Sequence, residues 1–254
     1  MTITKSITIY CDGVIGGVLA TGTNGIVVNA GATDVVVLRG LDIEGAGTGL
    51  NGIRFLAGAA LHVQESLIRN FQATAPNGNG IMFVPSTANA ELYVTDTIIS
   101  QNGTAIASTG VNQGAIQVEP TGSGSAKVVL SRVRIANNHS NGFRANSTGG
   151  STTIIATITD STIVGNGVHG VLTSAPVANG PVQLMIDGST LSNNSSAGIR
   201  TNGSSATIRI SNTNISGNAM GSQATNGAIF QSYGTNRIDG NTNDGPNPVI
   251  IPQK

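Results

Sequence analysis

A repeated phrase dominates this sequence: an aliphatic residue followed three positions later by asparagine. In the stretch "STIVGNGVHG", residues 161–170, the pair is Ile163 and Asn166. The aligned aliphatic residues are Ile43, Ile68, Ile99, Ile135, Ile163, Leu191, Ile215 and Ile238, at steps of 25, 31, 36, 28, 28, 24 and 23 residues. Three positions after them stand Ala46, Phe71, Asn102, Asn138, Asn166, Asn194, Asn218 and Asn241. A regular repeat of this length indicates a solenoid or a related repeat architecture.

Each repeat also contains the pattern of short strands. Apolar residues stand seven and five positions before the aligned aliphatic residue, and a spacing of two places both side chains on one face of a strand. The pairs are Val36/Leu38, Leu61/Val63, Leu92/Val94, Val128/Leu130, Ala156/Ile158, Leu184/Ile186 and Ile208/Ile210, and the same offsets give Gln231/Tyr233 in the eighth repeat. Glycine followed by an apolar residue, as in Gly170-Val171, begins a second strand at a position where a Cβ would clash.

These patterns predict an all-β chain, folded as a right-handed parallel β-helix of about eight coils. The leucine-rich consensus of another solenoid with this period is missing, and a sandwich or barrel would not repeat identical offsets. We expect the aliphatic residues to stack as a ladder inside the column. The asparagines should bend the chain in the left-handed conformation and hydrogen-bond from coil to coil. One domain is expected over residues 1–254, with a first incomplete coil at 1–24 and a C-terminal tail at 242–254.

The composition is that of a packed but weakly charged protein. Charged residues make up 9% of the chain, against about 25% in an ordinary soluble domain. The formal net charge is zero, so nothing attracts the whole molecule to nucleic acid or to an anionic membrane. No apolar run is long enough to span a membrane. Met1 leads directly into a strand pattern, so we expect no signal peptide in this sequence, and the lone Cys11 excludes an internal disulfide.

Three stretches carry a family resemblance: "TITKSITI" (2–9), "ITDSTIVGNGVHGV" (158–171) and "SYGTNRIDGNTNDG" (232–245). They resemble bacterial right-handed parallel β-helix repeat proteins of the pectate-lyase-like superfamily, over nearly the whole chain. The resemblance implies an extracytoplasmic protein, whether secreted, periplasmic or on the cell surface. It also implies an export signal and a further segment upstream, so that this chain begins partway into the first coils.

The catalytic signatures of that superfamily are incomplete here. Polygalacturonase-type hydrolases carry Gly-His-Gly, whereas this chain has Gly167-Val168-His169-Gly170 with an intruding valine. Their Arg-Ile-Lys is replaced by Arg134-Ile135-Ala136, and Asp-Asp and Asn-Thr-Asp are missing. The sequence contains no tryptophan, which excludes the tryptophan-containing pectate-lyase signatures. These absences argue against both the polygalacturonase-type hydrolysis and the pectate-lyase reaction, and they leave a divergent lyase open.

One column of charged residues is the first candidate site. Three positions before the aligned aliphatic residues stand Glu65, Asp96, Arg132 and Asp160, and equal offsets in successive coils stack about 5 Å apart. Glu65 and Asp96 should repel each other, so that one pKa is raised or the two share a cation. They would then serve as the acid and nucleophile of a glycosidase or as ligands of Ca²⁺, with Arg132 as the base of a lyase. The structural alternative is that the carboxylates cap the turn backbone.

Two outward-facing rows are the second candidate. The row that follows the glycine-apolar pairs contains Val27, Arg54, Met82, Gln117, Arg144, Leu172, Arg200 and Phe230. Arg54, Arg144 and Arg200 are predicted to bind the carboxylates of an acidic polysaccharide, since guanidinium pairs with them bidentately; ordinary solvated strand positions are the alternative. On another strand row, Tyr93 beside His62 would stack on a sugar ring, with a plain surface histidine as the alternative.

The sequence therefore leaves three functions open. The first is a secreted or surface β-helix protein that interacts with polysaccharide and has no recognisable catalytic signature. The second is a divergent polysaccharide lyase or glycoside hydrolase, assisted by Ca²⁺, that uses Glu65, Asp96 and Arg132. The third is a structural or adhesive spacer. Whether the chain is an enzyme, and whether it forms a homo-oligomer through its coil ends or a covered face, is not decided by the sequence.

Overall fold

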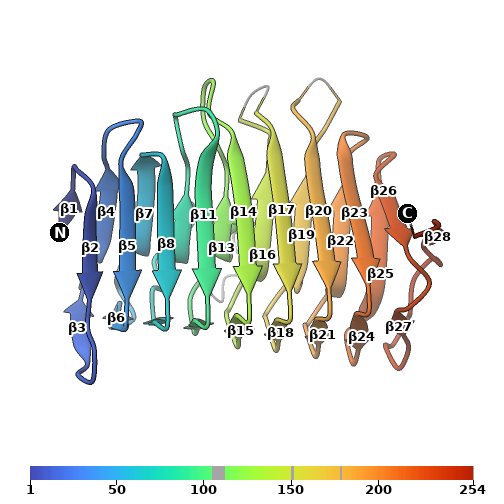
Figure 1. The fold of residues 1–254 in the computed structure, drawn as a ribbon. Coiled ribbons are helices and arrows are strands. Elements are labelled where there is room, and N and C mark those ends of the chain that lie inside the picture. The colour runs from blue at the N-terminus through green and yellow to red at the C-terminus, as the bar shows by residue number, and fades with distance from the viewer. Residues whose placement is uncertain (105–111, 150–151, 178, 254) are drawn as a thin grey trace.

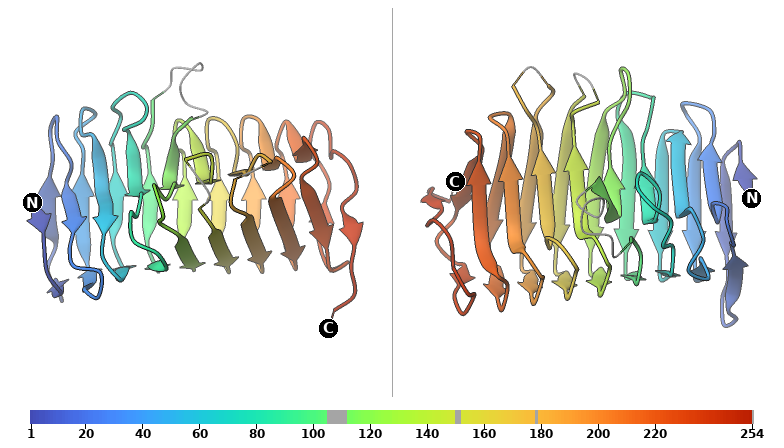
Figure 2. Two further views of the ribbon diagram at one scale, coloured as in Figure 1. Left: turned by 90° about the horizontal axis from the view of Figure 1, so that it is seen from above. Right: turned by 180° about the vertical axis from the view of Figure 1, so that it is seen from behind.

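The computed structural model describes residues 1–104, 112–149, 152–177 and 179–253. Within these residues there is no α-helix, and the strands form three parallel sheets wound as a solenoid (Figure 1). Successive coils lie side by side along one axis, with the two ends of the chain at opposite ends of the column (Figures 1 and 2). The predicted parallel β-helix is thus confirmed. No helix in this described portion of the chain is long and apolar enough to cross a membrane.

Each coil contributes one strand to each of three sheets, which we name A, B and C. Sheet A contains β1 (Thr2–Ile3), β4 (Ile26–Asn29), β7 (Asn51–Ala57), β10 (Asn79–Phe83), β13 (Gly114–Val118), β16 (Asn141–Asn146), β19 (Val171–Ser174), β22 (Ala197–Asn202) and β25 (Met220–Thr225). Sheet B contains β2 (Ile7–Tyr10), β5 (Val35–Arg39), β8 (Ala60–Gln64), β11 (Ala90–Thr95), β14 (Ala126–Ser131), β17 (Ile154–Thr159), β20 (Val182–Asp187), β23 (Ala206–Ser211), β26 (Ile229–Ser232) and β28 (Val249–Ile250). Sheet C contains β3 (Gly16–Leu19), β6 (Leu41–Glu44), β9 (Leu67–Arg69), β12 (Ile98–Ser100), β15 (Arg134–Ala136), β18 (Thr162–Val164), β21 (Thr190–Ser192), β24 (Asn214–Ser216) and β27 (Arg237–Ile238).

The core is a set of aliphatic ladders inside the column. The central members of the predicted ladder pair in register from coil to coil, as Ile135 does with Ile163 and Ile163 with Leu191. They are fully buried, from Ile43 to Ile215. Burying such a side chain contributes roughly 1.5–3 kcal/mol relative to leaving it in water. Because each rung repeats the same contacts, the ladder stays in register although the number of residues between rungs varies from 23 to 36.

The asparagine ladder is present, but its members do not bend the chain. The Asn166 side chain is buried; its Oδ1 accepts the backbone N–H of Asn138 and its Nδ2 donates to Oδ1 of Asn194. The left-handed residue lies one position earlier, at Asn137 (φ 56°) and Gly165 (φ 66°). The predicted conformational role of the ladder asparagines was therefore wrong. Because the side-chain amide of each ladder asparagine is held in the interior, the preceding residue, which faces solvent, adopts the left-handed conformation at the turn.

The eighth sequence repeat, which contains β26 and ends at Ile238, departs from the predicted register by one residue. Phe230 and Ser232 pair with Ile208 and Ile210 and point inward, where the offsets predicted Gln231 and Tyr233. Six positions separate Ser232 from Ile238, whereas five separate Ile210 from the next ladder residue. The extra residue lies in the turn, so counting back across it reverses every side chain of β26.

The two ends of the column differ. Residues 1–24, predicted as an incomplete coil, contribute β1, β2 and β3, one strand to each sheet. In the tail, β28 adds a parallel strand beside β26, and Asp244 accepts the amide of Asn241. The last rung of the asparagine ladder is thereby satisfied by a carboxylate of the tail, which ends the repeat.

Candidate functional site

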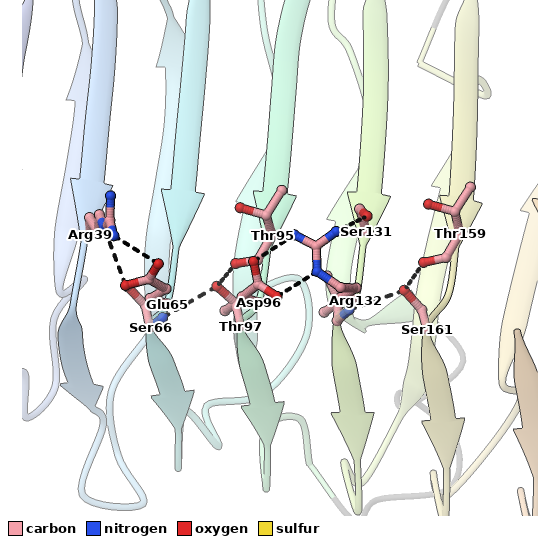
Figure 3. Close-up of polar contacts among 11 residues, drawn as sticks. Arg39, Glu65, Ser66, Thr95, Asp96, Thr97, Ser131, Arg132, Thr159 and Ser161 are labelled. Atoms are coloured by element: carbon pink, nitrogen blue, oxygen red, sulfur yellow. Dashed lines mark hydrogen bonds and ion pairs between the residues drawn. The ribbon is translucent and has the colours of Figure 1, made fainter.

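The charged column occupies the corner between sheets B and C. Glu65, Asp96, Arg132 and Asp160 are all exposed there and all have positive φ, between 47° and 53°. Gly40 and Gly188 take the same conformation at the same corner in other coils. Glu65, Asp96 and Arg132 follow one another along this corner in successive coils (Figure 3). The structure therefore brings these four predicted residues into one outward-facing row.

Arginines neutralise two of the carboxylates in this row. Arg39 donates to both oxygens of Glu65, at 3.1 and 2.9 Å, and Arg132 donates to both oxygens of Asp96, at 2.7 and 2.7 Å (Figure 3). Hydrogen bonding from Arg132 lowers the pKa of the Asp96 carboxyl, where mutual repulsion of carboxylates had predicted a raised value. The same contact raises the pKa of Arg132, which keeps the guanidinium protonated. Glu65 and Asp96 therefore share no cation, because each carboxylate pairs with its own arginine, Arg39 of the preceding coil and Arg132 of the next coil.

Hydroxyl groups, and not the carboxylates, hold the corner backbone. The Ser66 hydroxyl donates to the Gln64 carbonyl at 2.7 Å and accepts the N–H of Leu41 from the preceding coil. Thr97 repeats this by accepting the N–H of Ser66. No hydrogen bond from backbone to the corner carboxylates is seen among the residues the structure describes. The residue that caps the turn is therefore the Ser or Thr that follows each corner carboxylate, and not the carboxylate itself. The left-handed conformation of Glu65 and Asp96 turns their side chains away from the backbone that they were expected to cap.

A groove of about 490 Å³ runs beside this corner, bordered by Cys11, Ile15, Glu65, Asp96 and Ile98. Its walls are mostly apolar. A Ca²⁺ ion here would need six or more oxygen ligands, and both carboxylates are already engaged by guanidinium groups. The described residues contain no group of three or more histidine, cysteine or acidic side chains suited to a metal. The corner therefore fits a divalent cation poorly, and the calcium binding that the sequence suggested for Glu65 and Asp96 is untested.

The predicted arginine row lies on the outer face of sheet A. Successive pairs are in register: Arg54 with Met82, Gln117 with Arg144, Arg144 with Leu172, and Leu172 with Arg200. The row ends in Gln223 of β25 and not in the predicted Phe230, which lies on β26 of sheet B. Its middle is not an ordinary solvated surface, since Met82, Gln117, Arg144 and Leu172 are at most 9% exposed.

Arg144 is the most enclosed arginine of this row, at 8% exposure. Its Nη1 lies 3.5 Å from Oε2 of Glu119, and the two oxygens of Glu119 also accept hydrogen bonds from Gln117 and Asn146. Its Nε is buried and has no partner among the described residues. Burial lowers the pKa of Arg144, and the Glu119 carboxylate opposes that shift. A buried guanidinium with one unused donor is costly unless an acceptor reaches it.

His169 stands beside this arginine row and was not among the predicted site residues. Its backbone N–H is accepted by Oδ1 of Asn141, and its own Nδ1 accepts the N–H of Ala197 at 3.1 Å. Asn51 has the same role in an earlier coil, where its Oδ1 accepts the N–H of Asn79. The signal was present in the sequence, since His169 precedes a glycine-apolar pair at the position that asparagine occupies in other repeats.

Burial and the nearby Arg200 lower the pKa of His169 to about 4. The ring is therefore neutral near neutral pH. Arg200 Nη1 lies 3.5 Å from Nε2 of this ring, and Nε of Arg200 is buried without a described partner. Arg144, His169 and Arg200 line one cavity of about 260 Å³ together with Asn112, Leu172, Ser174 and Asn202. We call this cavity the basic pocket.

The remaining predicted binding residues lie apart from the basic pocket. Arg54 is half-buried in β7, and its Nε also has no partner among the described residues. His62 and Tyr93 lie on sheet B, paired in register, with their rings stacked at 4.7 Å between centroids. The Tyr93 hydroxyl donates to Glu91 at 2.8 Å. The predicted adjacency of His62 and Tyr93 is confirmed; sugar stacking on the pair stays a prediction.

Comparison of the chain with protein-family models and with curated proteins finds no match. The class of protein is therefore defined by the fold alone, a parallel β-solenoid with asparagine ladders.

Proposed function

We propose that this protein is an extracytoplasmic β-solenoid that binds an acidic polysaccharide along the outer face of sheet A. The observation that supports this is the pair Arg144 and Arg200, whose guanidinium groups line one cavity and each keep an unpartnered, buried Nε among the described residues. Such donors bind planar carboxylates well, because the guanidinium fork matches their geometry. The extracytoplasmic location comes from the family resemblance.

The shape of sheet A suits a linear polymer. Each coil contributes one residue to the arginine row, and coils repeat at about 4.8 Å. Arg144 and Arg200 are two coils apart, or roughly 10 Å, and Arg54 lies three coils, or roughly 14 Å, beyond Arg144. A chain lying along the solenoid axis would meet these three cations in turn, whereas a small ligand could reach only one or two.

A divergent lyase or hydrolase at the B–C corner is the weaker candidate. A general acid needs a raised carboxyl pKa, whereas the Asp96 carboxyl has a lowered one. Arg132 has a raised pKa and is a poor base. The observation in favour of this candidate is the groove beside Glu65 and Asp96. A structural or adhesive spacer needs only the ladders, and it gives no reason for buried arginines with unused donors.

The test is affinity electrophoresis in gels containing polygalacturonate, alginate or neutral dextran. We expect retardation by a polyuronate and none by dextran, with about tenfold weaker binding after Arg200→Gln. Arg134→Gln is the matched control, since it removes the same charge from an exposed position on sheet C. Equal migration of the wild type in polyuronate and in dextran would refute the proposal.

A further inference from the structure

The basic pocket has an unusual arrangement of donors. Ala197 donates its N–H to Nδ1 of His169, so Nδ1 carries no proton. A neutral imidazole has one proton, which must then be on Nε2. The ring therefore presents an N–H, and not a lone pair, toward the pocket.

Arg200 faces that same N–H. Its Nη1 is 3.5 Å from Nε2 of His169, and a guanidinium nitrogen can only donate. Two donors that face each other make no hydrogen bond, so neither Arg200 Nη1 nor His169 Nε2–H has an acceptor in this contact. Buried polar groups without partners cost free energy. An acceptor from outside the described residues, a water or a ligand oxygen, would satisfy both donors.

Arg144 borders the other side of the pocket. Glu119 holds Nη1 at 3.5 Å, and its two oxygens are already shared with Gln117 and Asn146. Glu119 is therefore the carboxylate that orients Arg144, and it leaves Nε of Arg144 unused among the described residues. Two guanidinium groups and one carboxylate give the pocket a surplus of one positive charge, which a single monoanion would balance.

We propose that Arg144, His169 and Arg200 form a seat for one carboxylate group of a sugar acid. This inference rests on the proposed function, because it names the portion of the polymer that the arginine row holds. The carboxylate accepts from the Arg200 guanidinium and from the Nε2–H of His169 on one side, and the Arg144 guanidinium lies on the other. Leu172 supplies an apolar contact for the carbon face of the sugar, and Ser174 and Asn202 supply polar contacts for its hydroxyls.

A carboxylate matches the charge of this pocket better than a phosphate does. The charge surplus of one matches a monoanion, whereas a phosphate monoester carries up to two charges near neutral pH. A guanidinium group can bind the two oxygens of a carboxylate in a bidentate geometry. The volume of about 260 Å³ is enough for a portion of one sugar ring and not for an oligosaccharide. The polymer would therefore place one acidic residue in the pocket and run along sheet A on either side.

The experiment is an NMR titration of the imidazole nitrogens of His169 with galacturonate, with galactose and with inorganic phosphate. We expect galacturonate to bind at millimolar concentration and to move the Nε2–H resonance of His169, and galactose to do neither. Arg200→Gln should weaken galacturonate by about tenfold or more, and Arg134→Gln should leave it unchanged. His169→Asn keeps the ladder acceptor that asparagine provides in other coils, so it should fold normally and bind galacturonate about fivefold more weakly.

The outcomes separate this seat from the proposed function. Binding of polygalacturonate with no effect of galacturonate on His169 would leave the polysaccharide proposal standing and overturn the seat. Tighter binding of phosphate than of galacturonate would show an anion site of different chemistry, which also overturns it. Failure of both polymer and monomer would overturn both proposals. A response to galacturonate that Arg200→Gln does not diminish would place the carboxylate elsewhere and count against the seat.

Discussion

Replacing Asn166 with alanine tests whether the asparagine ladder stabilises the column. The side chain is fully buried and links two neighbouring coils. Its Oδ1 accepts the N–H of Asn138 at 3.2 Å and the Nδ2 of Asn138 at 3.0 Å, and its Nδ2 donates to Asn194 at 2.9 Å. Alanine removes all three hydrogen bonds while leaving the backbone conformation accessible.

The expected cost is about 3 kcal/mol of unfolding free energy. The Asn138 N–H loses its partner inside the column, which costs about 1–3 kcal/mol. The other two bonds contribute about 0.5–1.5 kcal/mol each at most. They fall at the low end, because Nδ2 of Asn138 keeps the carbonyls of Ile99 and Ala136, and Oδ1 of Asn194 keeps the N–H of residue 166.

Urea unfolding followed by circular dichroism measures this free energy, and amide hydrogen exchange at Asn138 reports the local effect. Asn214→Ala is the control, since Asn214 is exposed in β24 and has no side-chain hydrogen bond among the described residues. The control should cost less than about 0.5 kcal/mol. A loss below about 1 kcal/mol for Asn166→Ala, with Asn138 exchange unchanged, would refute the ladder as a source of stability.

Three further predictions concern other regions of the molecule. Gly170→Ala should cost about 1–3 kcal/mol in urea unfolding, because its Cβ would lie 2.7 Å from the carbonyl oxygen of Gly198; a neutral result would contradict the close packing of the coils. The free energy of unfolding should fall by at most about 3 kcal/mol as the pH drops from 6.5 toward 4. In this range His169 takes up a proton in the unfolded chain but not in the folded protein, where its pKa is about 4. His169→Asn should flatten this pH dependence, and an unchanged dependence would show that His169 is not its source. Millimolar Ca²⁺ should leave the melting temperature unchanged in wild type and in the Glu65→Gln/Asp96→Asn double variant; a rise confined to wild type would revive the metal-assisted lyase.

The sequence predicted rows and registers well. Ile163 and its equivalents are inward and buried, Tyr93 lies beside His62, and Arg144 and Arg200 share an outward row. These placements follow from residue spacing, because side chains alternate along a strand and the same positions repeat from coil to coil. The prediction failed in the eighth repeat, where one added turn residue places Phe230 and Ser232 inward instead of Gln231 and Tyr233. A spacing argument has no means of detecting an insertion until the partner strand is known.

The candidate sites were predicted incompletely. The column of Glu65, Asp96, Arg132 and Asp160 was located correctly, but its chemistry depends on which carboxylate pairs with which guanidinium group. The left-handed corner sends Asp96 toward Arg132, and Arg39 reaches Glu65 from the preceding coil. Such contacts join residues 26 or 36 positions apart, and no local pattern records them.

By itself, the sequence determined the architecture of this protein, because a solenoid coil contacts mainly its neighbours and every coil must repeat the same inward pattern. Only the tertiary structure decided where a ligand could be held. The enclosure of Arg144, the proton position on His169 and the unmet donor of Arg200 arise where separate coils meet and solvent is excluded. Desolvation and hydrogen-bond satisfaction depend on atoms brought together from different coils, and those quantities exist only once the chain has folded.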